Sequence, residues 1–215
     1  MLAPLALAAI WLGGSVFLGV VAGAAVGLAL EWVALCRLCR PWRLRAAAGV
    51  GWILLAFVAA LWVRADPLVG RANVGFLVLV VWASDVGAYL AGRVIGGPRL
   101  APAISPGKTW AGVLGGLAGA AAVGLAVAGL HAWRHHHLGS LGCWRAAAVA
   151  VGLSVLGQAG DLAESWAKRC FGVKDSGMLI PGHGGLLDRL DAALAVLPAA
   201  AALAYLLGPG VVLWR

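Results

Sequence analysis

Residues 110–132 read WAGVLGGLAGAAAVGLAVAGLHA, an apolar stretch without Asp, Glu, Lys or Arg. A helix needs about 20 such residues to cross the hydrocarbon core of a bilayer. The many glycines and alanines are typical of membrane helices, because small side chains let neighbouring backbones approach closely. This stretch therefore predicts a membrane-spanning helix.

The rest of the chain follows the same pattern. It is 63% hydrophobic and 11% charged, with a mean hydropathy of +0.96, whereas soluble domains carry about 25% charged residues. The other apolar blocks are residues 2–35, 46–63, 73–91, 144–162 and 190–213. The first block has no basic region ahead of it and is too long for a cleavable signal peptide. It is long enough to cross once at a tilt, or to form two short spans broken near Gly13 and Gly14. We predict an all-α fold, a polytopic transmembrane helix bundle with six or seven spans.

The basic residues are distributed unevenly over the connections between these blocks. The first, third and fifth connections hold eleven of the 16 Lys and Arg residues. By the positive-inside rule, these connections face the cytoplasm. The net charge of +8 reflects this topology and attraction to anionic lipid. Nucleic-acid binding is not expected, because it needs a basic face on a soluble domain; the expected environment is the lipid bilayer.

Acidic residues are few and concentrated near one end of the predicted bundle. Five of the eight are Asp161, Glu164, Asp175, Asp188 and Asp191. Asp85 lies inside an apolar block, where an ionisable group usually faces a partner or a water-filled cavity. The spacing of Asp161, Glu164 and Lys168 places them on one helix face. Carboxylates and phosphates are the ligands that Mg²⁺ prefers, so this pattern predicts a metal and phosphate site at the cytoplasmic face. Glu31, near the end of a span, is interpreted as a structural interfacial residue.

Two polar segments have the composition of anion-binding loops. Residues 177–185 read GMLIPGHGG, and glycines let backbone N–H groups converge on an anion. Residues 105–110, SPGKTW, precede a predicted helix. Ser105 or Thr109 there would cap that helix or bind phosphate at its N-terminus. Both interpretations stay open from the residues alone.

Residues 165–191, SWAKRCFGVKDSGMLIPGHGGLLDRLD, resemble the signature of the phosphatidate cytidylyltransferase (CDP-diacylglycerol synthase) family. Ser84-Asp85, Ala88-Tyr89 and Gly92-Arg93, followed by 104–109 (ISPGKT), resemble a second segment of that family. The resemblance covers about residues 80–191. Ala111 departs from it, since many members carry Glu there.

The resemblance implies cytidylyl transfer from CTP to phosphatidate, giving CDP-diacylglycerol and pyrophosphate. It implies Mg²⁺ as cofactor, together with a second, monovalent cation such as K⁺. The expected metal ligands are Asp161 and Asp188, supported by Glu164 and Asp191. The residues expected to be catalytic are Lys168, Arg169, Lys174, Asp175, His183 and Arg189. The residues expected to bind substrate are Asp85, Arg93, Ser105, Lys108, Thr109, Ser165, Gly184 and Gly185.

Some of these roles have alternatives. His183 would donate a proton to the leaving pyrophosphate or stabilise a turn. Asp85 would orient Arg93 or a neighbouring metal ligand, and Tyr89 is expected to pack. We predict one integral membrane domain over 1–215, with N-terminal helices in 1–75 and the catalytic helices and cytoplasmic loops in 76–215. A homodimer is compatible with the resemblance, and in a bacterium the location would be the inner membrane.

Two other functions fit parts of the pattern. One is a related CTP-dependent lipid enzyme, either a polyprenol kinase or a cytidylyltransferase acting on an ether lipid. The other is a non-enzymatic transporter built around intramembrane carboxylates. A transporter needs charge along a transmembrane path, whereas the charge here gathers at one face, which disfavours that reading.

Overall fold

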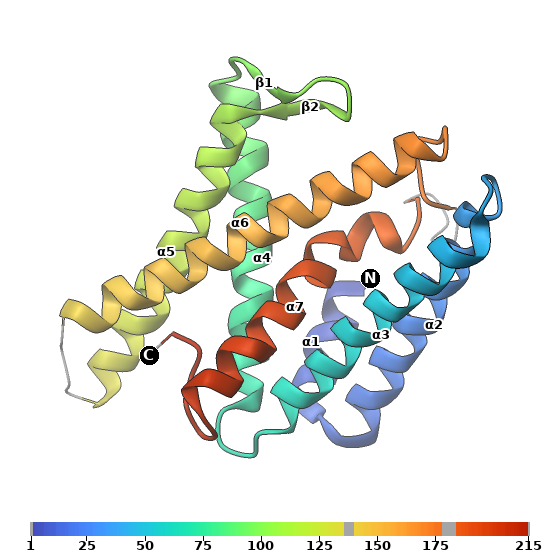
Figure 1. Ribbon diagram of the computed structural model, residues 1–215. Helices are drawn as coiled ribbons and strands as arrows, with labels where there is room; N and C mark the ends of the chain where they lie inside the picture. The colour runs from blue at the N-terminus through green and yellow to red at the C-terminus, as the bar shows by residue number, and fades with distance from the viewer. Residues whose placement is uncertain (1, 136–139, 178–183, 215) are drawn as a thin grey trace.

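The structure is a computed structural model that describes residues 2–135, 140–177 and 184–214. These residues form a bundle of helices with one small hairpin at its end (Figure 1). The elements in chain order are α1 (Leu2–Leu12), α2 (Gly14–Cys36), α3 (Trp42–Ala65), α4 (Gly70–Val94), β1 (Arg99–Ala101), β2 (Ser105–Thr109), α5 (Trp110–His135), α6 (Ser140–Cys170) and α7 (Leu187–Leu207). The predicted helix bundle is confirmed.

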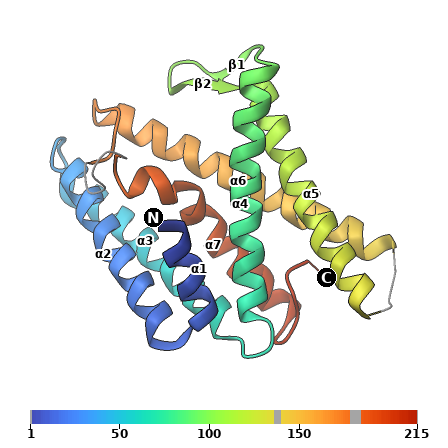
Figure 2. The same cartoon turned by 180° about the vertical axis from the view of Figure 1, so that it is seen from behind.

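The helices α2 to α7 are each long and apolar enough to cross a membrane, so the described residues contain six candidate spans. The 11 residues of α1 rise about 16 Å at 1.5 Å per residue, half of the hydrocarbon thickness of about 30 Å. The chain breaks after α1 because Gly13 and Gly14 have φ values of 67° and 51°, a region that favours glycine. The first apolar block therefore makes one span and one short helix, and Figure 2 shows α1 folded back beside α2.

An arginine holds this break in place. Arg64 Nε on α3 donates a hydrogen bond to the carbonyl oxygen of Ile10 at 3.0 Å. Its guanidinium carbon also lies 5.8 Å from the centre of the Phe17 ring. The carbonyl groups of the last turn of a helix lack partners within that helix. Arg64 satisfies one of them and joins α1, α2 and α3.

The connections that the sequence assigns to one face lie at one end of the bundle. Figure 1 shows the turn between α2 and α3, the β1–β2 hairpin and the C-terminal end of α6 at the top of the view. Arg169 Nε donates to the carbonyl oxygen of Ile104 at 3.2 Å, which joins α6 to the hairpin. The thiol of Cys39, after α2, lies 3.9 Å from the carbonyl oxygen of Cys170. The third connection was expected to be a loop, whereas the structure pairs Arg99 with Thr109 in an antiparallel hairpin.

The opposite end of the bundle is closed by the C-terminal segment. Asp66 accepts hydrogen bonds from the backbone N–H groups of Leu68, Val69 and Gly210, and these bonds lower the pKa of its carboxyl group. The buried Asn73 accepts a hydrogen bond from the N–H of Leu213 at 2.9 Å. This end is therefore fixed by polar contacts that are separate from those of the acidic residues.

Helices α4 and α5 pack with their backbones almost in contact at glycines. A Cβ atom added to Gly115 would overlap the side chain of Ala91 and the carbonyl oxygen of Gly87. A Cβ atom at Gly119 would likewise meet the carbonyl oxygen of Ala83. Small residues at such positions allow van der Waals packing between membrane helices. This close approach aligns the end of α4 with the start of α5.

We expect Gly115→Val to destabilise the bundle by about 1–3 kcal/mol, the usual cost of overpacking. Gly129→Val is the matched control on the same helix, because nothing lies within 4 Å of a Cβ built at Gly129. The measurement is the unfolding of both variants in detergent, followed by circular dichroism. Equal stability of the two variants would contradict the close α4–α5 packing.

Candidate functional site

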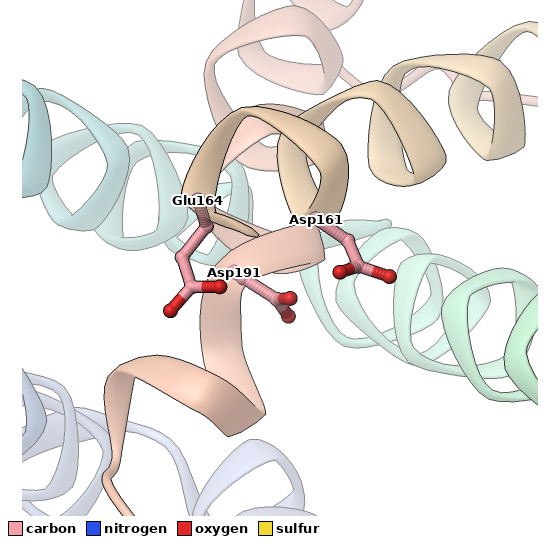
Figure 3. A group of neighbouring side chains, drawn as sticks. All are labelled: Asp161, Glu164 and Asp191. Carbon is pink, nitrogen blue, oxygen red and sulfur yellow. The ribbon is translucent and has the colours of Figure 1, made fainter. Parts of the chain in front are cut away.

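Three carboxylates from two helices converge near the hairpin end of the bundle. Asp161 and Glu164 come from α6 and Asp191 from α7 (Figure 3). One oxygen from each lies within 4.8 Å of the others. The two helices approach closely because Gly160 of α6 has no side chain; a Cβ there would lie 2.7 Å from that of Ala195. The glycine in the sequence thus allows the acidic residues of two spans to share one site.

Two lysines neutralise part of this negative charge. Lys108 Nζ of β2 lies 2.7 Å from Asp161 Oδ2. Lys168 Nζ lies between Glu164 Oε2 at 2.8 Å and Asp188 Oδ1 at 2.6 Å. The side chain of Lys168 is only 13% exposed, and charges this far from water are usually paired. The predicted acidic face of α6 is therefore present, with Lys168 joining it to α7.

The carboxylate cluster has the donor set of a divalent-cation site. Glu164 Oε1 is buried and has no hydrogen-bond partner among the residues that the structure describes. An unpartnered buried carboxylate oxygen is costly, and oxygen ligands of this kind are what Mg²⁺ takes. Asp161, Glu164 and Asp191 therefore fit a metal ion chemically.

Asp188, which the sequence predicts to be a metal ligand, contacts protein donors in the structure. Its Oδ1 is paired with Lys168, and its Oδ2 accepts hydrogen bonds from Ser176 N at 3.2 Å, Ser176 Oγ at 3.0 Å and Gly185 N at 3.1 Å. Both oxygens are thus engaged by protein donors. In this arrangement Asp188 holds Ser176 and Gly185, which lie between α6 and α7. Asp191 lies in the carboxylate cluster with Asp161 and Glu164. Metal binding by any of these residues stays a prediction.

A cavity of about 360 Å³ lies between α4, α5, α6 and β2, next to the cluster. Its lining contains five of the residues predicted to form the site: Asp85, Arg93, Lys108, Thr109 and Asp161. Cavities that bind small molecules occupy about 300–1,000 Å³ and combine apolar walls with a few polar groups. The cavity therefore brings together residues from two separate polar segments of the chain.

Two contacts at the cavity wall involve residues whose roles the sequence left open. Thr109 Oγ1 accepts a hydrogen bond from Gly112 N at 3.0 Å, so Thr109 caps α5, which begins at Trp110. Arg93 donates to the hydroxyl of Tyr89 at 2.6 Å. Tyr89 therefore forms a hydrogen bond to Arg93 in addition to packing.

Among the described residues, the carboxylate cluster consists of Asp161, Glu164 and Asp191, and the other predicted residues lie elsewhere in these elements and connections. Arg169 donates to the backbone at Ile104 and Val173. Lys174 and Asp175 are exposed after α6, and Arg189 is exposed in the first turn of α7. Ser105 lies in β2, Ser165 on α6 and Gly184 in the connection before α7. His183 lies outside the described residues.

The sequence analysis missed one wall residue, Gln158. It lines the cavity and donates from Nε2 to Ser154 Oγ at 3.2 Å and to the carbonyl oxygen of Val113 at 3.5 Å. Ser154 in turn is hydrogen-bonded to the buried Ser84 at 2.7 Å. The sequence signal for Gln158 was an amide side chain inside an apolar block, three residues before Asp161.

The fold and the site define an integral membrane protein with a charged cavity at one end of its bundle. Residues 43–207 match the model of the cytidylyltransferase family, and the chain belongs to this family. It is 46% identical over 188 residues to a phosphatidate cytidylyltransferase of Brucella suis biovar 1 (strain 1330), which covers 87% of this chain and 63% of that protein. It is 43% identical over 133 residues to the phosphatidate cytidylyltransferase of Haemophilus influenzae (strain ATCC 51907 / DSM 11121 / KW20 / Rd), covering 62% of this chain and 46% of that protein. The chain thus spans less than two thirds of the length of these relatives.

Proposed function

We propose that the chain transfers the cytidylyl group of CTP to phosphatidate, giving CDP-diacylglycerol and pyrophosphate. The observation that carries the proposal is the carboxylate cluster beside a cavity that also holds Lys108 and Arg93. Such a site suits a reaction between two phosphorylated substrates. Relatives named phosphatidate cytidylyltransferase, which this chain resembles over most of its length, support the choice of substrates.

In the proposed reaction, a phosphate oxygen of phosphatidate attacks the α-phosphorus of CTP. The new phosphorus–oxygen bond forms as the bond from the α-phosphorus to the bridging oxygen breaks, and pyrophosphate leaves. A phosphate dianion is already nucleophilic, so the protein mainly has to position two anions and neutralise their charge. Lys108 and Arg93 in the cavity wall are the cations that we assign to this task.

We further propose that Asp161, Glu164 and Asp191 hold Mg²⁺. Bound there, the ion would neutralise nucleotide phosphate and stabilise the leaving pyrophosphate. The described residues contain one such cluster, and we therefore assign it one divalent ion. Lys168 keeps Glu164 and Asp188 at fixed separation through its two ion pairs. Lys108 keeps Asp161 next to the cavity through the ion pair between them.

The test of the reaction uses CTP labelled at either the α- or the γ-phosphate, with purified protein, phosphatidate and Mg²⁺. We expect the α label to enter the lipid fraction and the γ label to leave as pyrophosphate, because the α-phosphorus is the one attacked. Thin-layer chromatography separates the products. Transfer of the γ label to lipid would establish a lipid kinase instead, and no lipid product would refute the proposed function.

We propose that the hairpin end of the bundle faces the cytoplasm, since it carries most of the basic residues. The expectation is tested with single cysteines in a background without the four native ones. Ala103→Cys and Lys174→Cys should react with an impermeant maleimide from the same side of sealed vesicles, and Leu68→Cys from the other. Labelling of Ala103→Cys and Lys174→Cys from opposite sides would contradict a single site at this end.

A further inference from the structure

Glu31 is a buried acid on α2, in the part of the chain that precedes the family match at residues 43–207. Glu31 is only 5% exposed to solvent. No lysine or arginine forms an ion pair with it among the described residues. A buried carboxylate without a cation is stable only if hydrogen bonds replace its water. The groups that donate hydrogen bonds to Glu31 therefore indicate its structural role.

Two of the donors are the backbone amides at the start of α7. Leu186 N lies 2.9 Å from Glu31 Oε1, and Leu187 N lies 2.9 Å from Glu31 Oε2. The first N–H groups of a helix have no partner within it, and a negative charge there is favourable to the helix dipole. Leu186, at the N-cap position, forms no side-chain cap of its own. Glu31 thus caps α7 from a different helix.

The third donor lies at the other end of the same loop. Ser176 Oγ is 3.4 Å from Glu31 Oε2 and 3.0 Å from Asp188 Oδ2. The backbone is also close: a Cβ at Gly177 would lie 3.0 Å from Glu31 Oε1, and one at Gly185 would lie 2.9 Å from Glu31 Oε2. The chain on both sides of residues 178–183 therefore packs on one carboxylate.

We infer that Glu31 is a positioning residue for the site. It fixes the start of α7, and α7 carries both Asp188, the partner of Lys168, and Asp191 of the carboxylate cluster. Asp188 and Asp191 lie within the first two turns after the N-cap Leu186, so their positions depend on where and at what angle α7 begins. The inference rests on the proposed function and extends it to a helix outside the matched family region.

The test compares wild type with Glu31→Gln, which keeps the shape but turns an NH₂ group toward backbone N–H donors. Hydrogen exchange by mass spectrometry should show faster exchange in peptides covering residues 184–190. Without substrates, Mn²⁺ affinity by electron paramagnetic resonance should fall about 10–100-fold, as when a second layer of hydrogen bonds around metal ligands is lost. Turnover with saturating Mg²⁺ should recover in part, which a general folding defect would not allow.

The matched control is Asn73→Asp, an isosteric change at a buried polar residue at the opposite end of the bundle. It should leave the exchange of residues 184–190 and the Mn²⁺ affinity unchanged. Wild-type exchange and Mn²⁺ affinity in folded Glu31→Gln would overturn the inference, as would equal effects of both substitutions. If Glu31→Gln does not fold, Glu31→Asp carries the same test, since it keeps the charge but shortens the reach. Absence of CDP-diacylglycerol formation by wild type would refute the proposed function, whereas the exchange experiment would still report on Glu31.

Discussion

Asp161→Asn is expected to lower turnover by about 10²–10³-fold, the usual effect of removing one electrostatic contact to a transition state. Asp161 belongs to the carboxylate cluster and also forms an ion pair with Lys108 of the cavity wall at 2.7 Å. Asn keeps the size but loses the negative charge that attracts Mg²⁺. The Mg²⁺ concentration for half-maximal activity should therefore rise along with the loss in turnover. We expect the same two changes for Asp191→Asn.

The measurement is activity as a function of Mg²⁺ concentration, normalised to the folded fraction of each variant. Asp66→Asn is the matched control, because it makes the same chemical change at the opposite end of the bundle, where Asp66 binds three backbone N–H groups. This control should lose stability and keep the wild-type Mg²⁺ dependence. If Asp161→Asn, once folded, shows wild-type turnover and the same Mg²⁺ dependence, Asp161 does not belong to a metal site.

The transmembrane architecture was predictable because its causes are local. Apolar blocks long enough to cross a bilayer identify spans without knowledge of their neighbours. Whether residues 2–35 cross once or twice depended on the backbone at Gly13 and Gly14, whose positive φ values end α1. The hairpin was missed because its five-residue strand contains Pro106 and Gly107, which give no alternating strand pattern.

The site was predictable in part. The spacing of Asp161, Glu164 and Lys168 on one helix requires that they share a face, and the structure confirms that they do. The choice between Asp188 and Asp191 as neighbours of Asp161 depended on the rotation of α7 against α6, which sequence spacing does not determine. The contact of Glu31 with Leu187 joins positions 156 residues apart, and no pattern in a single sequence links them.

Lys168→Met is expected to cost about 3–5 kcal/mol of stability, the effect of removing one partner from a buried ion pair. Met keeps the length of the side chain but leaves Glu164 and Asp188 facing each other without the cation between them. The side chains of these two acids are only 8% and 18% exposed, so water screens their repulsion poorly. The loss should appear as a lower midpoint in denaturant unfolding in detergent.

Lys108→Met is the matched comparison, because Lys108 also forms an ion pair with an acid of the cluster. Its side chain and that of Asp161 are 25% and 38% exposed, more than those of Lys168 and its partners, so water screens this pair better and its loss should cost less stability. Lys108→Met should therefore unfold near the wild-type midpoint while losing activity, since Lys108 lines the cavity. Lys168→Met should lose both stability and activity. The Mg²⁺ affinity of its remaining folded fraction should also change, because Glu164 has lost its ion-pair partner. If Lys168→Met were as stable as wild type, the ion pairs that join α6 to α7 would contribute no stability, and the two helices would have to be held together by the small-residue packing at Gly160.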